Sequence, residues 1–355
     1  MKARFWLNKV PEQTRNSEHG SLFLYLALPL LLLLSACAEQ GGRQAVVLSG
    51  PTMGTDYRIT VVSEASLDVA QLETDIVGQL DAVNASMSNW LSDSEVSQIN
   101  LLPANQAFQV SNSLAEVLDE ALQISKYTSG AFDITTAPAV RLWGFGSEGV
   151  VNKAPTGEQL ESLRQSVGYY KLRLNGNTLI KSHPGTEVNL SAIAKGYAVD
   201  QIAQLLESQG VTDFLVNVGG ELRASGRNVN QQVWKVAIEK PQVLGGVQEV
   251  IELRDLAIAT SGDYRNYLLI DGKKYSHTID PMTLRPVLHR IALVSVLSEQ
   301  TSTADALATA LMAMGEDAAI RFADQHEIAA YFVLRSAAGD GFEVSKSEKF
   351  KQLTE

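Results

Sequence analysis

The sequence contains a single cysteine, Cys37, in 355 residues. Without a second cysteine the chain cannot form an intramolecular disulfide, so a hydrophobic core must hold the fold together. Hydrophobic residues make up 45% of the chain, which is ample for one large domain or two small ones.

Positive charge is also scarce. The chain has 29 lysines and arginines against 40 aspartates and glutamates, for a formal net charge of −11. No basic stripe or lysine-rich segment is present to neutralise phosphates. We therefore expect no nucleic-acid partner, and we take the acidic balance as a contribution to solubility.

The familiar nucleotide-binding loops are missing as well. The glycines form neither a Walker loop nor a Gly-x-Gly-x-x-Gly motif between a strand and a helix. A nucleotide would therefore need a different kind of binding site. No low-complexity linker divides residues 46–345. We expect these residues to form one catalytic unit, followed by a C-terminal tail at 346–355.

The N-terminus is typical of a lipoprotein signal peptide. An apolar run from Leu22 to Leu34 follows a basic segment and ends at Ser35-Ala36-Cys37. The run is too short for a comfortable transmembrane helix, and small residues before a cysteine favour cleavage. We predict a signal peptide at 1–36, a lipid on Cys37 and a tether at 37–45; the alternative is an uncleaved signal anchor with an incidental cysteine.

Hydrophobic periodicity predicts a mixture of helices and strands. Strands are expected at 57–62, 214–218, 234–239, 248–253 and 291–297, and helices at 67–87, 114–127, 191–209 and 304–314. Because these elements alternate without a fixed repeat, the pattern favours a single mixed α+β domain over a barrel, a solenoid or a doubly wound sheet.

The helix near residue 304 carries two candidate metal ligands. Asp305 and Thr309 are four residues apart, so they project from one helix face, and Ser302 or Thr303 could cap the helix. Hard oxygen ligands of this kind suit Mg²⁺. The alternative is that Asp305 only complements the helix dipole while Thr309 packs.

Two further side chains could handle a phosphate or a proton. Lys195 lies where a helix would begin, so it and the free backbone N–H groups could face an anion. His277 precedes an Asp280-Pro281 turn and could accept a proton from a hydroxyl or orient a phosphate. A single histidine is more often structural.

Taken together, the residues resemble the ApbE family of FAD:protein FMN transferases. Nine short segments occur in family order over nearly all of the chain after the signal peptide: Met53–Thr55, Met87–Trp90, Gly130–Thr135, Leu142–Gly146, Ser191–Asp200, Asn217–Glu221, Thr260–Tyr264, His277–Pro281 and Ala304–Thr309.

The resemblance implies a Mg²⁺-dependent cleavage of FAD that releases AMP and joins FMN to a threonine or serine hydroxyl of a target protein. It implies Asp305, Thr309 and the carbonyl of Ala192 as metal ligands, and His277 as the residue that activates the hydroxyl. The positions that would line the flavin nucleotide are Met53, Trp90, Ala131, Phe132, Asp133, Asn189, Lys195 and Ile279. Trp90 could stack on a ring of the nucleotide, or it could be a core tryptophan.

The sequence departs from many relatives at two places. Asn189 replaces an aspartate, which would let the side chain donate a hydrogen bond as well as accept one. Ala308 stands where some relatives carry an acidic residue, which argues against a second metal.

The resemblance also implies partners and a location. The expected targets are periplasm-exposed subunits of Nqr- and Rnf-type electron-transport complexes, with the chain anchored to the inner membrane by its lipid on the periplasmic side. Two alternatives use the same residues: an FAD pyrophosphatase, in which water replaces the acceptor hydroxyl, and a flavin-binding lipoprotein without catalysis.

Overall fold

The computed structural model describes residues 43–63, 67–146, 148–242, 245–339 and 341–355. The predicted signal peptide, Cys37 and most of the tether lie outside these residues. Within the described ranges, no helix has the length and hydropathy needed to cross a membrane. Residues Arg43–Glu355 form one compact unit.

An eight-stranded sheet runs through this unit, and every neighbouring pair in it is antiparallel. In spatial order its strands are β1 (Gln44–Thr52), β2 (Thr55–Ser63), β6 (Asp213–Val218), β7 (Glu221–Ser225), β10 (Ala257–Gly262), β15 (Ile291–Ser298), β16 (Ala329–Arg335) and β17 (Phe342–Lys346).

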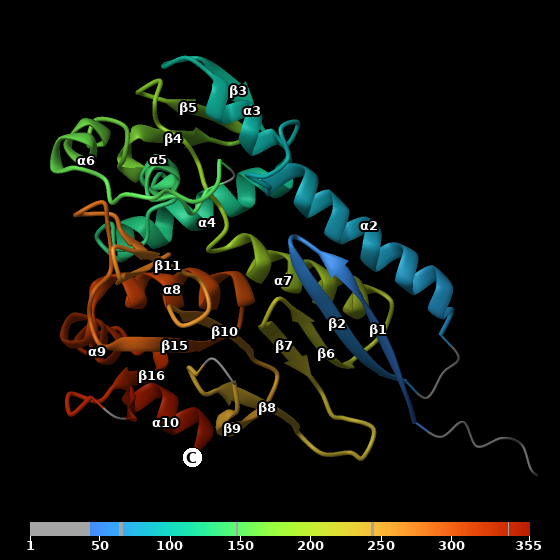
Figure 1. Ribbon diagram of the computed structural model, residues 1–355. Helices are drawn as coiled ribbons and strands as arrows, with labels where there is room; N and C mark the ends of the chain where they lie inside the picture. The colour runs from blue at the N-terminus through green and yellow to red at the C-terminus, as the bar shows by residue number, and fades with distance from the viewer. Residues whose placement is uncertain (1–42, 64–66, 147, 243–244, 340) are drawn as a thin grey trace, which may run out of the picture. The chain divides into compact units, whose positions relative to one another are not determined.

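Both faces of the sheet are covered (Figure 1). Along β16, Phe332 packs into one core and its neighbours Tyr331 and Val333 into the other, as the two-residue period of a strand requires. The first face carries α2 (Val69–Met87), α4 (Asn112–Tyr127), α7 (Ala194–Ser208), α8 (Thr301–Met314) and α9 (Glu316–Gln325). The second carries the hairpin of β8 (Trp234–Glu239) and β9 (Val247–Leu253), with α10 (Glu348–Thr354).

Shorter elements form the rest of the unit. They are α3 (Glu95–Leu101), α5 (Ala137–Leu142), α6 (Gly157–Leu163), the 3₁₀ helix η1 (Tyr169–Lys171), the sheet β3 (Ala107–Gln109), β5 (Thr178–Lys181) and β4 (Leu172–Asn175), and the pairs β11 (Tyr267–Ile270) with β12 (Lys273–Ser276) and β13 (Ile279–Asp280) with β14 (Arg285–Pro286). Trp143, at the end of α5, joins this helix to the turn between β13 and β14, because its indole Nε1 donates to the carbonyl of Leu284 at 2.9 Å. These elements hold the loops that line the cavity described below.

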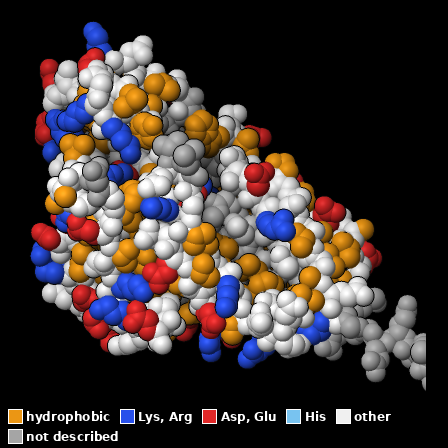
Figure 2. Space-filling model, turned by 60° about the horizontal axis from the view of Figure 1, so that its bottom comes forward, with side chains coloured by type: hydrophobic (Ala, Val, Ile, Leu, Met, Phe, Trp, Pro, Cys, Tyr) orange, Lys and Arg blue, Asp and Glu red, His pale blue; other side chains and the backbone are white. Residues whose placement is uncertain are grey.

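The surface in Figure 2 carries acidic and basic side chains interspersed with apolar ones. This view brings forward the lower part of Figure 1, where β8, β9 and α10 lie. Interspersed charges of both signs are typical of a face in contact with water.

The structure confirms the α+β fold class and corrects three details. Residues 346–355 are not a free tail, because α10 forms there and Phe350 is fully buried against the sheet. The helix expected at 191–209 begins at Ala194. Neither Ser302 nor Thr303 caps α8, because the helix begins at Thr301 and both hydroxyls donate to Glu120 of α4 instead.

A buried lysine ties the short sheet to its surrounding loops. Lys181 is 2% exposed, and its ammonium donates to the carbonyls of Asn100 (2.8 Å), Pro184 (3.1 Å) and Thr186 (3.0 Å). Replacing it by methionine keeps the apolar stem but leaves three carbonyls without a donor. We expect Lys181→Met to lower the free energy of unfolding by about 3 kcal/mol, measured by urea denaturation. The exposed Lys153→Met serves as the control, and equal stability of the two variants would contradict this account.

Candidate active site

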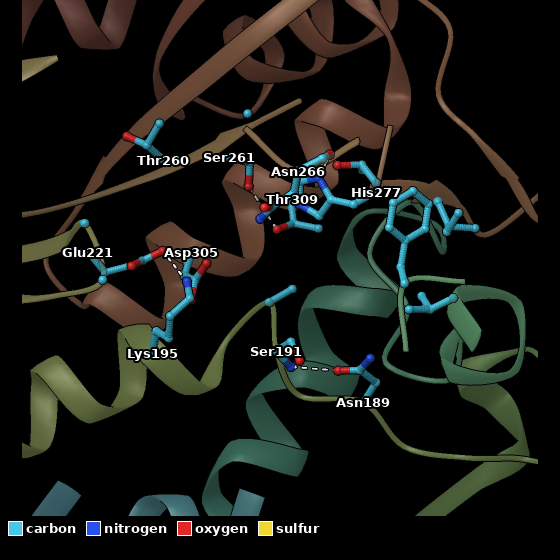
Figure 3. A pocket seen from close by; sticks show the side chains of 18 of the residues that line it. Asn189, Ser191, Lys195, Glu221, Thr260, Ser261, Asn266, His277, Asp305 and Thr309 are labelled. Carbon is cyan, nitrogen blue, oxygen red and sulfur yellow. Dashed lines mark hydrogen bonds and ion pairs between the residues drawn. The ribbon is translucent and has the colours of Figure 1, made fainter. Parts of the chain in front are cut away.

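A cavity of about 1370 Å³ opens between the elements of the main unit (Figure 3). Its lining comes from α7, α8, β7, β8, β10, the loop at 187–192 and the segments around Trp90, Ala131 and His277. The volume exceeds that of most drug-sized sites, so the cavity can hold a ligand as large as a dinucleotide.

Asp305, Glu221 and Lys195 lie together on one wall of the cavity, which we call the acidic wall. Asp305 of α8 is 3% exposed, and its Oδ2 is 3.9 Å from the Nζ of Lys195 on α7. Lys195 also forms a short ion pair with Oε1 of Glu221, which begins β7. The other oxygen, Oε2 of Glu221, is buried without a hydrogen-bond partner among the described residues. Figure 3 shows the three side chains converging.

Burial and charge act against each other on these groups. Burial raises the pKa of Asp305, and Lys195 together with the N–H of Gly196 opposes the rise. Burial raises the pKa of Glu221 to about 7 despite the nearby lysine. Burial alone would lower the pKa of Lys195, but the two carboxylates outweigh it and the pKa is raised. When both carboxylates are ionised, one excess negative charge remains beside the single ammonium.

A divalent cation fits this wall. Thr309 lies one helical turn beyond Asp305, and its hydroxyl is 3.0 Å from that of Ser261 on β10. Ala192, whose carbonyl the family resemblance implies as a third ligand, lines the same cavity. A carboxylate, a hydroxyl and a carbonyl are the hard oxygen donors that Mg²⁺ prefers, and the cation would offset the excess negative charge.

His277 is held in a defined tautomer. Its Nδ1 is 3.0 Å from the backbone carbonyl of Asn266, and a carbonyl only accepts, so Nδ1 must carry the proton. Burial lowers the pKa of His277 below its usual value of 6.5, partly offset by this hydrogen bond. At neutral pH the imidazole is therefore uncharged, and Nε2 is the lone-pair nitrogen.

The predicted flavin-contacting residues mostly line the cavity. Trp90 is 67% exposed at its edge, so the reading of Trp90 as a core tryptophan is wrong. Asn189 accepts the N–H of Ser191 through Oδ1 at 2.9 Å, so its NH₂ group is the part that a ligand would meet. Ala131, Lys195 and Ile279 also line the cavity.

Three of these residues differ from the expectation in detail. Met53 is not among the lining residues; it forms the β1–β2 turn with φ of 48°, and its side chain packs against the main core. Phe132 lines the cavity, but its side chain is 2% exposed in the same core. The carboxylate of Asp133 accepts from Thr135 and from the N–H of Tyr169, so it braces the loop.

Some lining residues were not singled out from the sequence. Glu221, Ser261 and Asn266 contact the predicted residues, and the cavity also contains an ion pair between Arg141 and Glu187. Glu221 had a local signal, because it follows the Gly-Gly turn of the β6–β7 hairpin. Ser261 reaches the site through the long-range pairing of β10 with β7 and β15.

An antiparallel α+β fold whose large cavity holds oxygen donors, a lysine and a neutral histidine is typical of an enzyme with its active site in that cavity. A family model described as the ApbE family matches residues 53–332. The chain belongs to the ApbE family.

Curated relatives and solved structures agree with the family model. A Vibrio cholerae protein named FAD:protein FMN transferase is 44% identical over 328 residues, which are 92% of this chain and 97% of that protein. A Haemophilus influenzae protein of the same name is 40% identical over 339 residues, covering 93% and 97%. The structure of the flavin transferase ApbE from Vibrio cholerae superposes with a TM-score of 0.81 at 43% identity, covering 87% of this chain and 99% of that one.

Proposed function

We propose that the chain, which is an FAD:protein FMN transferase, uses Mg²⁺ and attaches FMN to a threonine or serine hydroxyl of an acceptor protein. The observation that carries this proposal is that Asp305, Thr309, Lys195 and a neutral His277 line one cavity large enough for FAD. The curated relatives with this activity cover almost the whole chain.

The reaction is a phosphoryl-group transfer. The acceptor oxygen attacks the phosphorus on the FMN side of the pyrophosphate, and a new P–O ester bond forms. The bond from that phosphorus to the bridging oxygen breaks, and AMP leaves with the bridging oxygen. The hydroxyl proton passes to Nε2 of His277. Such a transfer depends on positioning and charge neutralisation more than on covalent help from the protein.

The residues of the acidic wall would hold the metal. Asp305, Thr309 and the carbonyl of Ala192 would bind Mg²⁺, which supplies charge neutralisation of the pyrophosphate oxygens. Lys195 adds a second positive charge on the same wall, and Glu221 fixes the position of its ammonium. Trp90 offers an exposed aromatic face at the edge of the cavity, where a ring of the nucleotide can stack.

Replacing His277 tests the proton step. We expect His277→Gln to lower the rate of FMN transfer by about 10²- to 10⁴-fold, the usual contribution of a general base, with little change in FAD affinity. The measurement is covalent flavin on the acceptor over time, beside equilibrium FAD binding. A variant that transfers at the parental rate would remove His277 from the mechanism.

The pH dependence follows from the direction of the His277 shift. Because its pKa is lowered, the neutral, proton-accepting form persists below pH 6.5 and is lost only as the pH falls through the lowered value. We expect kcat/KM for transfer to fall as the pH drops below 6.5 through the lowered pKa of His277, and this fall to be absent from His277→Gln. Glu221, whose pKa burial raises to about 7, titrates in both proteins. An equal fall in the two proteins would contradict the assignment of His277.

Two other activities would use the same cavity. An FAD pyrophosphatase would give AMP and free FMN, and a flavin-binding protein would leave FAD intact. The tautomer of His277 favours an enzyme, since its lone-pair nitrogen can take the proton of an attacking hydroxyl. Following AMP, free FMN and acceptor-bound flavin in one reaction separates the three.

The acceptors and the location are part of the proposal. We propose that the acceptors are periplasm-exposed subunits of Nqr- and Rnf-type complexes, and that a lipid on Cys37 anchors the chain to the periplasmic side of the inner membrane. The small residues Ser35 and Ala36 before the lone cysteine support the lipid anchor, and the choice of the inner membrane follows from the proposed acceptors. Expressing Cys37→Ser beside the parent and fractionating the cells tests the anchor: release of the variant supports it, and unchanged membrane association contradicts it.

A further inference from the structure

The first turns of α7 and α8 are in backbone contact. A Cβ placed on Gly196 of α7 would lie 2.4 Å from the carbonyl oxygen of Thr301 and 2.7 Å from the backbone nitrogen of Ser302, both at the start of α8. The two helices carry Lys195 and Asp305, so their relative position sets the acidic wall of the cavity.

A buried carboxylate from α7 caps α8. Oδ1 of Asp200 accepts from the backbone N–H of Thr301 (2.9 Å) and from its hydroxyl (2.8 Å), and Oδ2 accepts from the N–H of Ser302 (2.9 Å). Asp200 is 5% exposed. The residue in the capping position, Gln300, makes no side-chain cap bond. Asp200 therefore satisfies the free N–H groups that a helix usually caps from its own sequence.

The arrangement is reciprocal. Oδ2 of Asp305 on α8 accepts the N–H of Gly196 in the first turn of α7 at 3.2 Å. Each helix thus sends an aspartate to the N-terminal turn of the other. These crossed bonds fix both the distance between the helices and the direction of the Asp305 carboxylate, because Asp305 lies one turn after the residues that Asp200 holds.

Neighbouring charges keep Asp200 paired. Arg223 of β7 donates to its Oδ1 at 3.1 Å and also lies 3.5 Å from Glu207, further along α7. Asp200 is not among the residues that line the cavity, so it does not reach a bound nucleotide. Its influence on the site must pass through α8.

We propose that Asp200 is a positioning residue for the metal site: it sets the place of α8 and thereby the geometry of Asp305 and Thr309. This inference rests on the proposed function, in which Asp305 and Thr309 bind Mg²⁺. Groups that orient metal ligands commonly change metal affinity by 10- to 100-fold when they are replaced.

The test is a calorimetric titration of the purified full chain with Mg²⁺ in the absence of FAD. In Asp200→Asn, Oδ1 still accepts from Thr301, but the new NH₂ faces the N–H of Ser302. We expect Mg²⁺ binding to weaken by roughly 10- to 100-fold, and the KM for Mg²⁺ in the transfer reaction to rise by a similar factor. FAD affinity in EDTA should stay near the parental value, because Asp200 does not line the cavity, and Asp200→Ala should weaken Mg²⁺ binding further.

Glu207→Gln is the matched control, because Glu207 lies on the same helix, approaches the same arginine and is exposed. It should bind Mg²⁺ like the parent. Parental Mg²⁺ affinity in Asp200→Asn would overturn the inference. An equal loss of Mg²⁺ and FAD affinity would overturn it too, since it would indicate general unfolding. If Asp305→Asn binds Mg²⁺ as tightly as the parent, the proposed metal site itself is wrong.

Discussion

Replacing Asp305 by asparagine is expected to slow FMN transfer by about three orders of magnitude, the consequence of losing several kcal/mol of metal-supplied charge stabilisation. Asparagine keeps an oxygen that can accept the N–H of Gly196, so the helix contact survives while the charged ligand is removed. The rate is measured as covalent flavin on the acceptor at saturating FAD and Mg²⁺. Asp317→Asn on α9, where the side chain is exposed, is the control.

Thermal unfolding separates loss of the metal from loss of the fold. Burial raises the pKa of Asp305, so its charged form is disfavoured in the metal-free fold and destabilises that fold as the pH rises through the raised pKa. We therefore expect Asp305→Asn to unfold in EDTA at the same temperature as the parent or higher. Mg²⁺ should stabilise the parent and leave the variant unchanged. Equal stabilisation of both proteins would contradict metal binding at Asp305.

Replacing Gly196 by alanine is expected to lower both stability and activity. The added Cβ would meet the backbone of Thr301 and Ser302, and neither helix can move away without breaking the crossed aspartate bonds. We expect a loss of about 3 kcal/mol in the free energy of unfolding, measured by urea denaturation, together with a loss of transfer activity.

Gly78→Ala is the matched control for this substitution. Gly78 is also a helical glycine, on α2, but nothing lies within 4 Å of an added Cβ. Alanine there should stabilise the chain by about 0.5–1 kcal/mol, because it restricts the unfolded backbone. If the two variants prove equally stable, the close approach of α7 and α8 is wrong.

The sequence predicted the positions of the helices better than the arrangement of the strands in the sheet. The four predicted helices agree with α2, α4, α7 and α8 to within three residues at each end. Of the eight strands in the main sheet, β1, β7, β10, β16 and β17 were not predicted. Every residue of β16 from Ala329 to Leu334 is buried, so no polar alternation marks it, and β10 is short and rich in small residues. The order of strands in the sheet depends on pairing between distant segments, which local patterns do not encode.

The site shows the same division. The spacing of Asp305 and Thr309 predicted that they would share a helix face, and the family resemblance singled them out as metal ligands. Asp200 and Asp305 are 105 positions apart, and Glu221 meets Lys195 only after β7 has paired with β6. For Asp133 the sequence predicted the position but not the role of the side chain. The resemblance implies a contact with the flavin nucleotide, whereas the carboxylate accepts hydrogen bonds from Thr135 and from the N–H of Tyr169.

The most direct test is to incubate the purified protein with FAD, Mg²⁺ and a purified Nqr- or Rnf-type acceptor subunit, and to measure the intact mass of the acceptor together with the AMP released. The account predicts an acceptor that gains one FMN by a phosphoester at a threonine or serine, with one AMP per FMN attached and no product in EDTA. AMP and free FMN with an unmodified acceptor, or FAD recovered intact, would contradict it.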